Sequence, residues 1–168
     1  MIKVKNNFLN KKDFDHIKDV MLSSKFPWYY NKTKVDEEDR DDLYNYQLTH
    51  IFFRDGSANS SAYDLLEPVL KKLKVKEVIR IKANLVPRTS RIHKFEKHAD
   101  QDYNCKGAIL YINSNNGQTI FEEGRKDSQN KHVKSKENTI VLFNANQMHQ
   151  GTTCTNEKIR VLINFNYQ

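Results

Sequence analysis

The spacing of apolar residues changes once along the chain, near residue 77. Before that point, apolar residues in the segments 11–23 and 60–73 recur every three or four positions, which is the period of one face of an α-helix. After it, short segments either alternate apolar with polar residues or hold runs of branched and aromatic residues, which is typical of β-strands. The pattern therefore predicts two helices followed by at least five strands.

Two signals refine the predicted helices. Asn10 can cap the first helix, because its side chain can accept a hydrogen bond from the first turn. Pro68 lies inside the second helix and is expected to bend or shorten it, because proline has no backbone N–H. The apolar stripes are Phe14, Ile17, Val20 and Met21 in the first helix and Ala62, Leu65, Leu66, Val69, Leu70 and Leu73 in the second.

The predicted strands follow one another without an intervening helix, so we expect them to pair antiparallel. Asn116-Gly117 is a strong signal for a tight turn between two extended segments. We expect a mainly β (α+β) fold, a double-sheet jelly roll with the N-terminal helices packed on one sheet. The strands are predicted at residues 77–86, 106–113, 113–121, 138–144 and 159–167.

A length of 168 residues suits a single domain, residues 1–168. Residues 1–76 would form a mainly helical N-terminal support, and residues 77–168 would form the jelly-roll core. Residues 31–60 are rich in charge and lack a clear period. They could close over a substrate as a lid, or they could form a flexible surface loop.

The composition is that of a globular protein, with 38% hydrophobic and 29% charged residues. No apolar stretch approaches the ~20 residues that span a bilayer, and the first residues lack the apolar region of a secretory signal. Cys105 and Cys154 are too few for a disulfide framework. We therefore expect reduced thiols, no membrane partner and a cytoplasmic location.

The formal net charge of +7 is unevenly distributed. Residues 71–97 hold ten lysines and arginines against two acids, whereas residues 36–42 are mostly acidic. The basic segment could be a solvated face. It could also attract an anionic partner such as nucleic acid.

His98 and Asp100 are separated by one residue, just ahead of a predicted strand. Residues two apart on a strand face the same side, so the pair could bind one ion together. Asp102 lies ~13 Å from His98 along an extended strand, but it stays an alternative if that strand ends early. His149 follows a later strand and could complete the site. Two histidines and one carboxylate form the facial triad that binds ferrous iron and leaves positions open for an organic cosubstrate and dioxygen.

Arg160 is embedded in the last predicted strand. A guanidinium on the inner face of a strand is costly to bury without an acidic partner. A dicarboxylate cosubstrate could supply that partner through a bidentate pair. Tyr111 lies on the strand after the first metal-binding pair, and its hydroxyl could reach the same carboxylate.

These residues resemble the motif of the iron(II)/2-oxoglutarate-dependent dioxygenases, in which His98, Asp100, His149 and Arg160 would recur in this order. More narrowly, "AILYINSNNGQTIFEEG" is similar to a strand, glycine turn and Thr-X-Phe segment of the prolyl-4-hydroxylase-like branch. The stretches "FPWYY", "RIKANL" and "HQGTTCTNEKIRVLINFNY" are similar to small oxygenases of marine phages. The motifs lie within residues 78–168, with a weaker similarity at residues 26–30.

The resemblance implies a double-stranded β-helix in which His98, Asp100 and His149 bind Fe(II). It implies that Arg160 and Tyr111 bind the distal carboxylate of 2-oxoglutarate. Dioxygen would be the second cosubstrate, and ascorbate is a further candidate cofactor.

Two departures from the family pattern concern the cosubstrate pocket. Family members often carry Ser or Thr two positions after the arginine, where this chain has Leu162. The strand before the metal motif often carries a pocket tyrosine, for which Asn84 is the stand-in here. If the protein is phage-encoded, its cytoplasmic location would be that of the host cell.

The resemblance favours hydroxylation of a peptidyl or free amino-acid side chain, with release of succinate and carbon dioxide. The partner would then be a small molecule or a peptide. An alternative is oxidation or demethylation of a nucleic-acid base by the same chemistry, which the basic segment 71–97 supports and which needs a pocket for an extruded base. A second alternative is a non-enzymatic jelly-roll binding module, which would need no iron.

Overall fold

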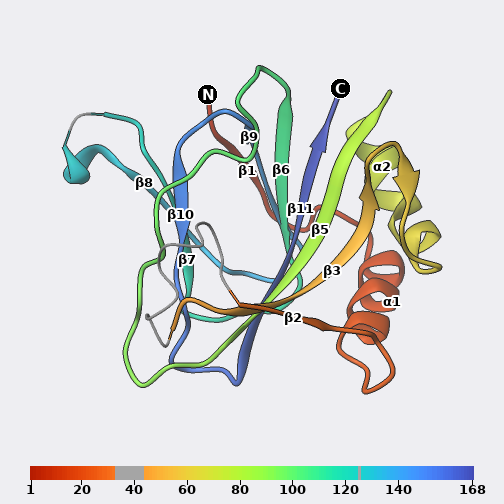
Figure 1. The fold of residues 1–168 in the computed structure, drawn as a ribbon, viewed down its shortest axis with the longest axis horizontal. Coiled ribbons are helices and arrows are strands. Elements are labelled where there is room, and N and C mark those ends of the chain that lie inside the picture. Colours follow the sequence, from red (N-terminus) through yellow and green to blue (C-terminus); the bar gives the residue numbers. More distant parts are fainter. Residues whose placement is uncertain (33–43, 125) are drawn as a thin grey trace.

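The computed structural model of the protein describes residues 1–32, 44–124 and 126–168. Within these residues, the strands form two antiparallel sheets (Figure 1). The larger sheet has eight strands, in the order β1-β9-β6-β11-β5-β3-β2 with β4 paired to β3, and the smaller sheet has the order β10-β7-β8. The strands are β1 (Lys3–Lys5), β2 (Tyr29–Asn31), β3 (Gln47–Arg54), β4 (Ser57–Ala58), β5 (Val78–Pro87), β6 (Lys106–Tyr111), β7 (Gln118–Phe121), β8 (Lys131–Lys134), β9 (Thr139–Asn144), β10 (His149–Gly151) and β11 (Ile159–Tyr167). The helices are α1 (Lys11–Met21), α2 (Glu67–Leu73) and the short 3₁₀ helices η2 (Tyr63–Leu66) and η3 (Asp127–Gln129).

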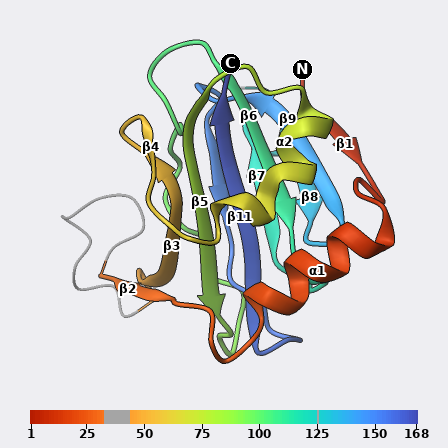
Figure 2. The same cartoon turned by 90° about the vertical axis from the view of Figure 1, so that its right-hand side faces the viewer.

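The larger sheet is covered on both faces. Figure 2 shows α1 and α2 lying across one face, and the smaller sheet lies on the other side in Figure 1. Successive residues of a strand point to opposite faces of the sheet. A central strand of a sheet covered on both faces therefore carries apolar residues at its even-numbered and its odd-numbered positions. In β6, Ala108 and Leu110 join the core beneath the helices, whereas Ile109 and Tyr111 join the core between the two sheets.

The first predicted helix is confirmed by α1. The Asn10 side chain caps it by accepting a hydrogen bond from the backbone N–H of Asp13 (2.9 Å). Its buried residues are Phe14, Ile17 and Met21.

The second predicted helix is shorter than the segment 60–73. The chain forms η2 and then α2, and Pro68 lies in the first turn of α2. Proline is tolerated in a first turn because the N–H groups there have no intrahelical partner. Within the described residues, no helix is long and apolar enough to cross a membrane.

Residues 1–76, expected to be mainly helical, also hold four strands of the larger sheet, β1 to β4, within the described residues. β3 lies in this part of the chain and pairs with β5. The apolar alternation in β3 is interrupted by His50, which is 4% exposed. Its two ring nitrogens lie 2.8 Å from the Pro27 carbonyl oxygen and 2.8 Å from Ser60 Oγ, so a polar residue is accommodated at a buried position.

Part of the segment 31–60, expected to be a lid or a flexible surface loop, instead forms the paired strands β3 and β4. Its residues 33–43 lie outside the described residues.

The segment around Asn116-Gly117 joins strands that do not pair with each other. β6 belongs to the larger sheet and β7 to the smaller one, so the chain crosses between the sheets here. Gly117 permits close packing, because an added Cβ would lie 2.6 Å from Cδ of Arg160 and 2.9 Å from the carbonyl oxygen of Thr153.

Packing of the helices on the sheet can be tested with two leucines. Leu66 has no exposed surface and belongs to the core beneath the helices, so Leu66→Ala should lower the free energy of unfolding by about 2–5 kcal/mol. Leu22 is 38% exposed, and Leu22→Ala should change it by less than about 0.5 kcal/mol. Urea denaturation measures both values, and equal losses would contradict this packing.

Candidate metal centre

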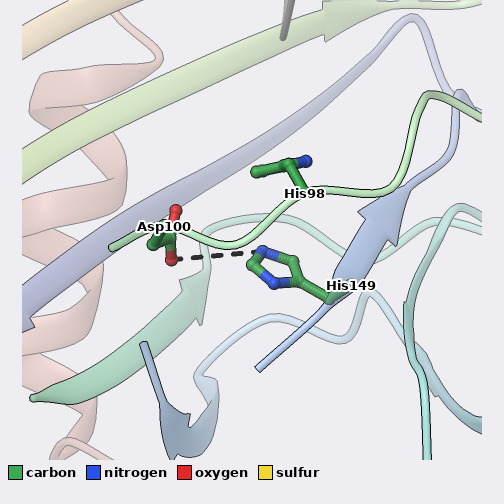
Figure 3. A group of neighbouring side chains, drawn as sticks. All are labelled: His98, Asp100 and His149. Carbon is green, nitrogen blue, oxygen red and sulfur yellow. Dashed lines mark ion pairs between the residues drawn. The ribbon is translucent and has the colours of Figure 1, made fainter. Parts of the chain in front are cut away.

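Three side chains that could bind a metal converge between the two sheets. His98, Asp100 and His149 each offer one ligand atom, and these atoms all lie within 4.8 Å of one another. Figure 3 shows the group, with the dashed line joining His149 Nε2 to Asp100 Oδ2 over 4.0 Å. Asp102 was the alternative to Asp100 as a ligand, and Asp100 is the carboxylate that the structure brings to the histidines.

The backbone brings these residues together. His98 and Asp100 lie in the loop between β5 and β6, and His149 begins β10. His98 and His149 form an antiparallel bridge in which each backbone N–H donates to the other residue's carbonyl oxygen (2.9 Å in both directions). The backbone N–H of Asp100 donates to the carbonyl oxygen of Ala145 (2.9 Å), so the loop is fixed to the β9–β10 connection as well as to the start of β10.

The two imidazoles are oriented as metal ligands usually are. Nδ1 of His149 lies 2.9 Å from the carbonyl oxygen of Gln147, and Nδ1 of His98 lies 3.3 Å from that of Glu96. A carbonyl oxygen only accepts, so the proton belongs on Nδ1 and the lone pair on Nε2. Burial, with His149 nearby, lowers the pKa of His98, which favours the neutral form that a metal requires.

Asp100 is held as a carboxylate by neighbours on the sheet. The Asn164 amide donates to both carboxylate oxygens (2.8 and 2.9 Å), and Arg80 forms an ion pair with Oδ1 (3.0 Å). Burial alone raises the pKa of Asp100, but His149, Arg80 and Asn164 outweigh it, so this pKa lies below its usual value. Two imidazoles and one ionised carboxylate form a donor set that fits ferrous iron.

The register between β5 and β11 orders the polar groups of the pocket. Arg160 pairs with Val86, Leu162 with Asn84, and Asn164 with Lys82. All six residues line one pocket together with the metal-binding group. Since Asn164 binds Asp100, the metal centre lies at one end of this pocket. The Arg160 backbone lies ~13 Å further along β11, and its guanidinium extends toward Gly151, two residues after His149.

Arg160 is 2% exposed, yet no carboxylate of the described residues pairs with its guanidinium. Nε donates to Ser135 Oγ (2.8 Å) and Nη2 donates to Thr119 Oγ1 (3.0 Å). Burial lowers the pKa of Arg160, which reflects the cost of keeping this charge away from water. A buried cation held by neutral hydroxyls at the end of a pocket is suited to bind an anion.

Tyr111 and Asn84 lie differently with respect to the pocket. The Tyr111 hydroxyl is fully buried and donates to Thr119 Oγ1 (2.8 Å), so this side chain lies behind Thr119, which lines the pocket. Asn84 lines the pocket itself, and its buried Oδ1 has no hydrogen-bond partner within the part of the chain that the structure describes. The predicted contacts of both residues with a cosubstrate stay predictions.

Sequence reasoning missed the residues that support the site. Arg80 and Asn164 lie on predicted strands, at even-numbered positions that share a face with the other residues of the pocket. The alternation along these strands could therefore have indicated them. Ser135 had no such signal, because it follows β8, a strand that was not predicted.

Comparison with known proteins gives structural matches. No family model and no curated protein matches the sequence. An oxidoreductase of the 2OG-Fe(II) oxygenase family from Burkholderia pseudomallei aligns with a TM-score of 0.73 at 9% identity, covering 99% of this chain and 84% of that chain. A prolyl hydroxylase from Trichoplax adhaerens, in complex with a hypoxia inducible factor peptide fragment, aligns with a TM-score of 0.73 at 11% identity, covering 99% and 82%. A prolyl-4-hydroxylase from Pseudomonas putida aligns with a TM-score of 0.61 at 14% identity, covering 99% and 92%.

At these identities the likeness establishes the fold. The chain has the jelly-roll fold of these proteins, with its two stacked antiparallel sheets, and this agrees with a double-stranded β-helix. The predicted fold class is therefore confirmed.

Metal binding by this group can be tested by removing one imidazole. His149→Ala should weaken binding of Fe(II) at least about 100-fold, because changes that only disturb a ligand's orientation already cost 10–100-fold. His16 is exposed on α1, so His16→Ala should bind Fe(II) as the unmodified protein does. Anaerobic titration with Fe(II) measures both affinities, and equal values for the two variants would rule out His149 as a ligand.

Proposed function

We propose that the protein is an Fe(II)- and 2-oxoglutarate-dependent dioxygenase. The observation that carries this proposal is the position of Arg160. Its buried guanidinium has no carboxylate partner among the described residues and lies in the same pocket as the His98, Asp100 and His149 group. A donor set for iron at one end of a pocket and a cation at the other match the two ends of a 2-oxo dicarboxylate. The structural neighbours from the 2OG-Fe(II) oxygenase family support the same assignment.

The roles of the chain's own residues follow from their contacts. His98, Asp100 and His149 would hold the ferrous ion, which when bound supplies the site for dioxygen chemistry. Arg160 would bind the distal carboxylate of 2-oxoglutarate, with Thr119 and Ser135 keeping the guanidinium in place.

The overall reaction is balanced by the two atoms of dioxygen. 2-Oxoglutarate loses its C1 carboxylate as carbon dioxide and gains one oxygen atom to become succinate. The other oxygen atom enters a C–H bond of the substrate, which becomes an alcohol. The chain's contribution is to place the substrate C–H beside the metal centre and to shield the pocket from water.

A peptidyl or free amino-acid side chain is the substrate class that we propose. The Trichoplax prolyl hydroxylase is bound to a peptide fragment, which supports this class for the shared fold. The basic segment 71–97, which had suggested nucleic acid, is divided over α2, β5 and a loop. Two of its charges have partners within the protein, since Arg80 pairs with Asp100 and Lys97 with Glu122.

The reaction itself gives a direct test. The purified protein with Fe(II), dioxygen and 2-oxoglutarate should form succinate slowly even without a substrate, and chelation of the iron should abolish this. Mass spectrometry of the succinate formed under ¹⁸O₂ should show one labelled oxygen atom. Absence of iron-dependent succinate would favour the non-enzymatic binding module.

Arg160→Met should weaken 2-oxoglutarate binding at least about 30-fold, because truncating one partner of a buried charge pair typically costs about 2–5 kcal/mol. The Fe(II) affinity should be retained, since Arg160 does not contact the metal-binding group. Arg88 is exposed, and Arg88→Met is the matched control. Anaerobic titration of the Fe(II) protein, followed by the weak visible absorption of the iron–cosubstrate complex, measures the affinity. An unchanged affinity in Arg160→Met would remove Arg160 from this role.

A further inference from the structure

Lys82 is a second cation in the pocket, besides Arg160. It lies on β5, half-buried, and among the described residues no carboxylate lies within ion-pair distance of its ammonium group. The carboxylate whose charge acts on the pKa of Lys82 is Asp100, which is already bound by Arg80 and Asn164. Lys82 takes no part in the proposed binding of Fe(II) and 2-oxoglutarate.

The strand register places Lys82 at the metal end of the pocket. Lys82 pairs with Asn164, the residue whose amide binds Asp100, whereas Arg160 lies four residues further along β11. The two backbones are therefore ~13 Å apart, although the Arg160 guanidinium extends toward Gly151, two residues after His149. Because Arg160 already offers a cation to the distal carboxylate of 2-oxoglutarate, Lys82 is left for another ligand.

Lys82 also lies where two cavities meet. The pocket that contains Arg160 and the metal-binding group shares Lys82 and Asp100 with a second cavity of about 660 Å³. The second cavity is lined by residues of β2, β3 and β5, including Tyr30, Thr49 and Ile51. A molecule in this cavity would contact Lys82 and reach the metal-binding group from the side opposite Arg160.

The other cations of this second cavity are already paired. Arg80 binds Asp100 (3.0 Å) and also donates to Asn166 Oδ1 (3.1 Å). Arg54 forms an ion pair with Asp55 (3.4 Å). Within the described residues, Lys82 is therefore the cation of this cavity that lacks a partner. Burial, assisted by the charge of Arg80, lowers the pKa of Lys82 to about 8, so most molecules still carry the charge at pH 7.

We infer that Lys82 binds a carboxylate of the substrate in the second cavity, so that the substrate is a small carboxylic acid such as a free amino acid. This inference rests on the proposed function and narrows its substrate class. A single unpaired ammonium matches the single charge of a carboxylate. A phosphate monoester carries about −1.5 to −2 at pH 7 and would need a further cation.

The test compares free amino acids with their uncharged carboxamides as stimulants of succinate formation. The probes are the twenty common L-amino acids, their α-carboxamides, a proline-containing peptide blocked at both ends and a single-stranded oligonucleotide. We expect one or more free acids to stimulate turnover, with kcat/KM at least 30-fold above that of the matching carboxamide. Lys82→Met should reduce this ratio to below 3, and Lys82→Arg, which keeps the charge, should restore most of it. Lys76 is exposed, so Lys76→Met is the matched control and should keep the full ratio.

Each outcome decides the inference. It is overturned if no free acid stimulates turnover, if a carboxamide, the blocked peptide or the oligonucleotide is preferred, or if Lys82→Met keeps the ratio. Iron-dependent succinate formation without substrate is measured first in the unmodified protein. If the unmodified protein forms no iron-dependent succinate, the proposed function is wrong. If it does form succinate and one of the overturning outcomes above is observed, only the role of Lys82 is wrong.

Discussion

The antiparallel pairing of β5 with β11 is the constraint on which the rest of the site depends. It sets Val86 beside Arg160 and Lys82 beside Asn164, and these two pairs mark the two ends of the pocket. Because the side-chain period of a strand is two, a shift of one residue would turn every one of these polar groups toward the core beneath the helices. The apolar residues on the opposite face, such as Ile81 and Ile163, bury that face fully and so hold the register.

The metal-binding group depends on this sheet without being part of it. His98 and Asp100 lie in a loop, and a loop alone would not hold two ligands in place. The backbone bridge to His149 and the Asn164 amide beneath Asp100 supply the missing rigidity. Arg160, by contrast, lies on a strand of the larger sheet, and hydroxyls from the smaller sheet and from the segment after β8 hold its guanidinium in place. Residues of both sheets therefore contribute to the pocket at its metal end and at its Arg160 end.

Much of this arrangement could be predicted from local sequence. The alternation of apolar and polar residues correctly predicted β5 as a strand, and the spacing of His98 and Asp100 anticipated their convergence. β3 was missed because His50 interrupts its apolar pattern, and only the folded chain supplies the two hydrogen bonds that make a buried histidine acceptable. The contact of Ser135 with Arg160 and the lack of a carboxylate partner for Lys82 among the described residues could not be predicted, because both depend on which distant residues become neighbours.

The most direct measurement is an anaerobic crystal structure of the protein grown with Fe(II) and 2-oxoglutarate, with anomalous data collected at the iron edge. We expect one iron peak bound by His98, Asp100 and His149, with the diacid extending from it to the Arg160 guanidinium and not bound to the Lys82 ammonium. An iron peak elsewhere, or a diacid that does not reach Arg160, would contradict the proposed site.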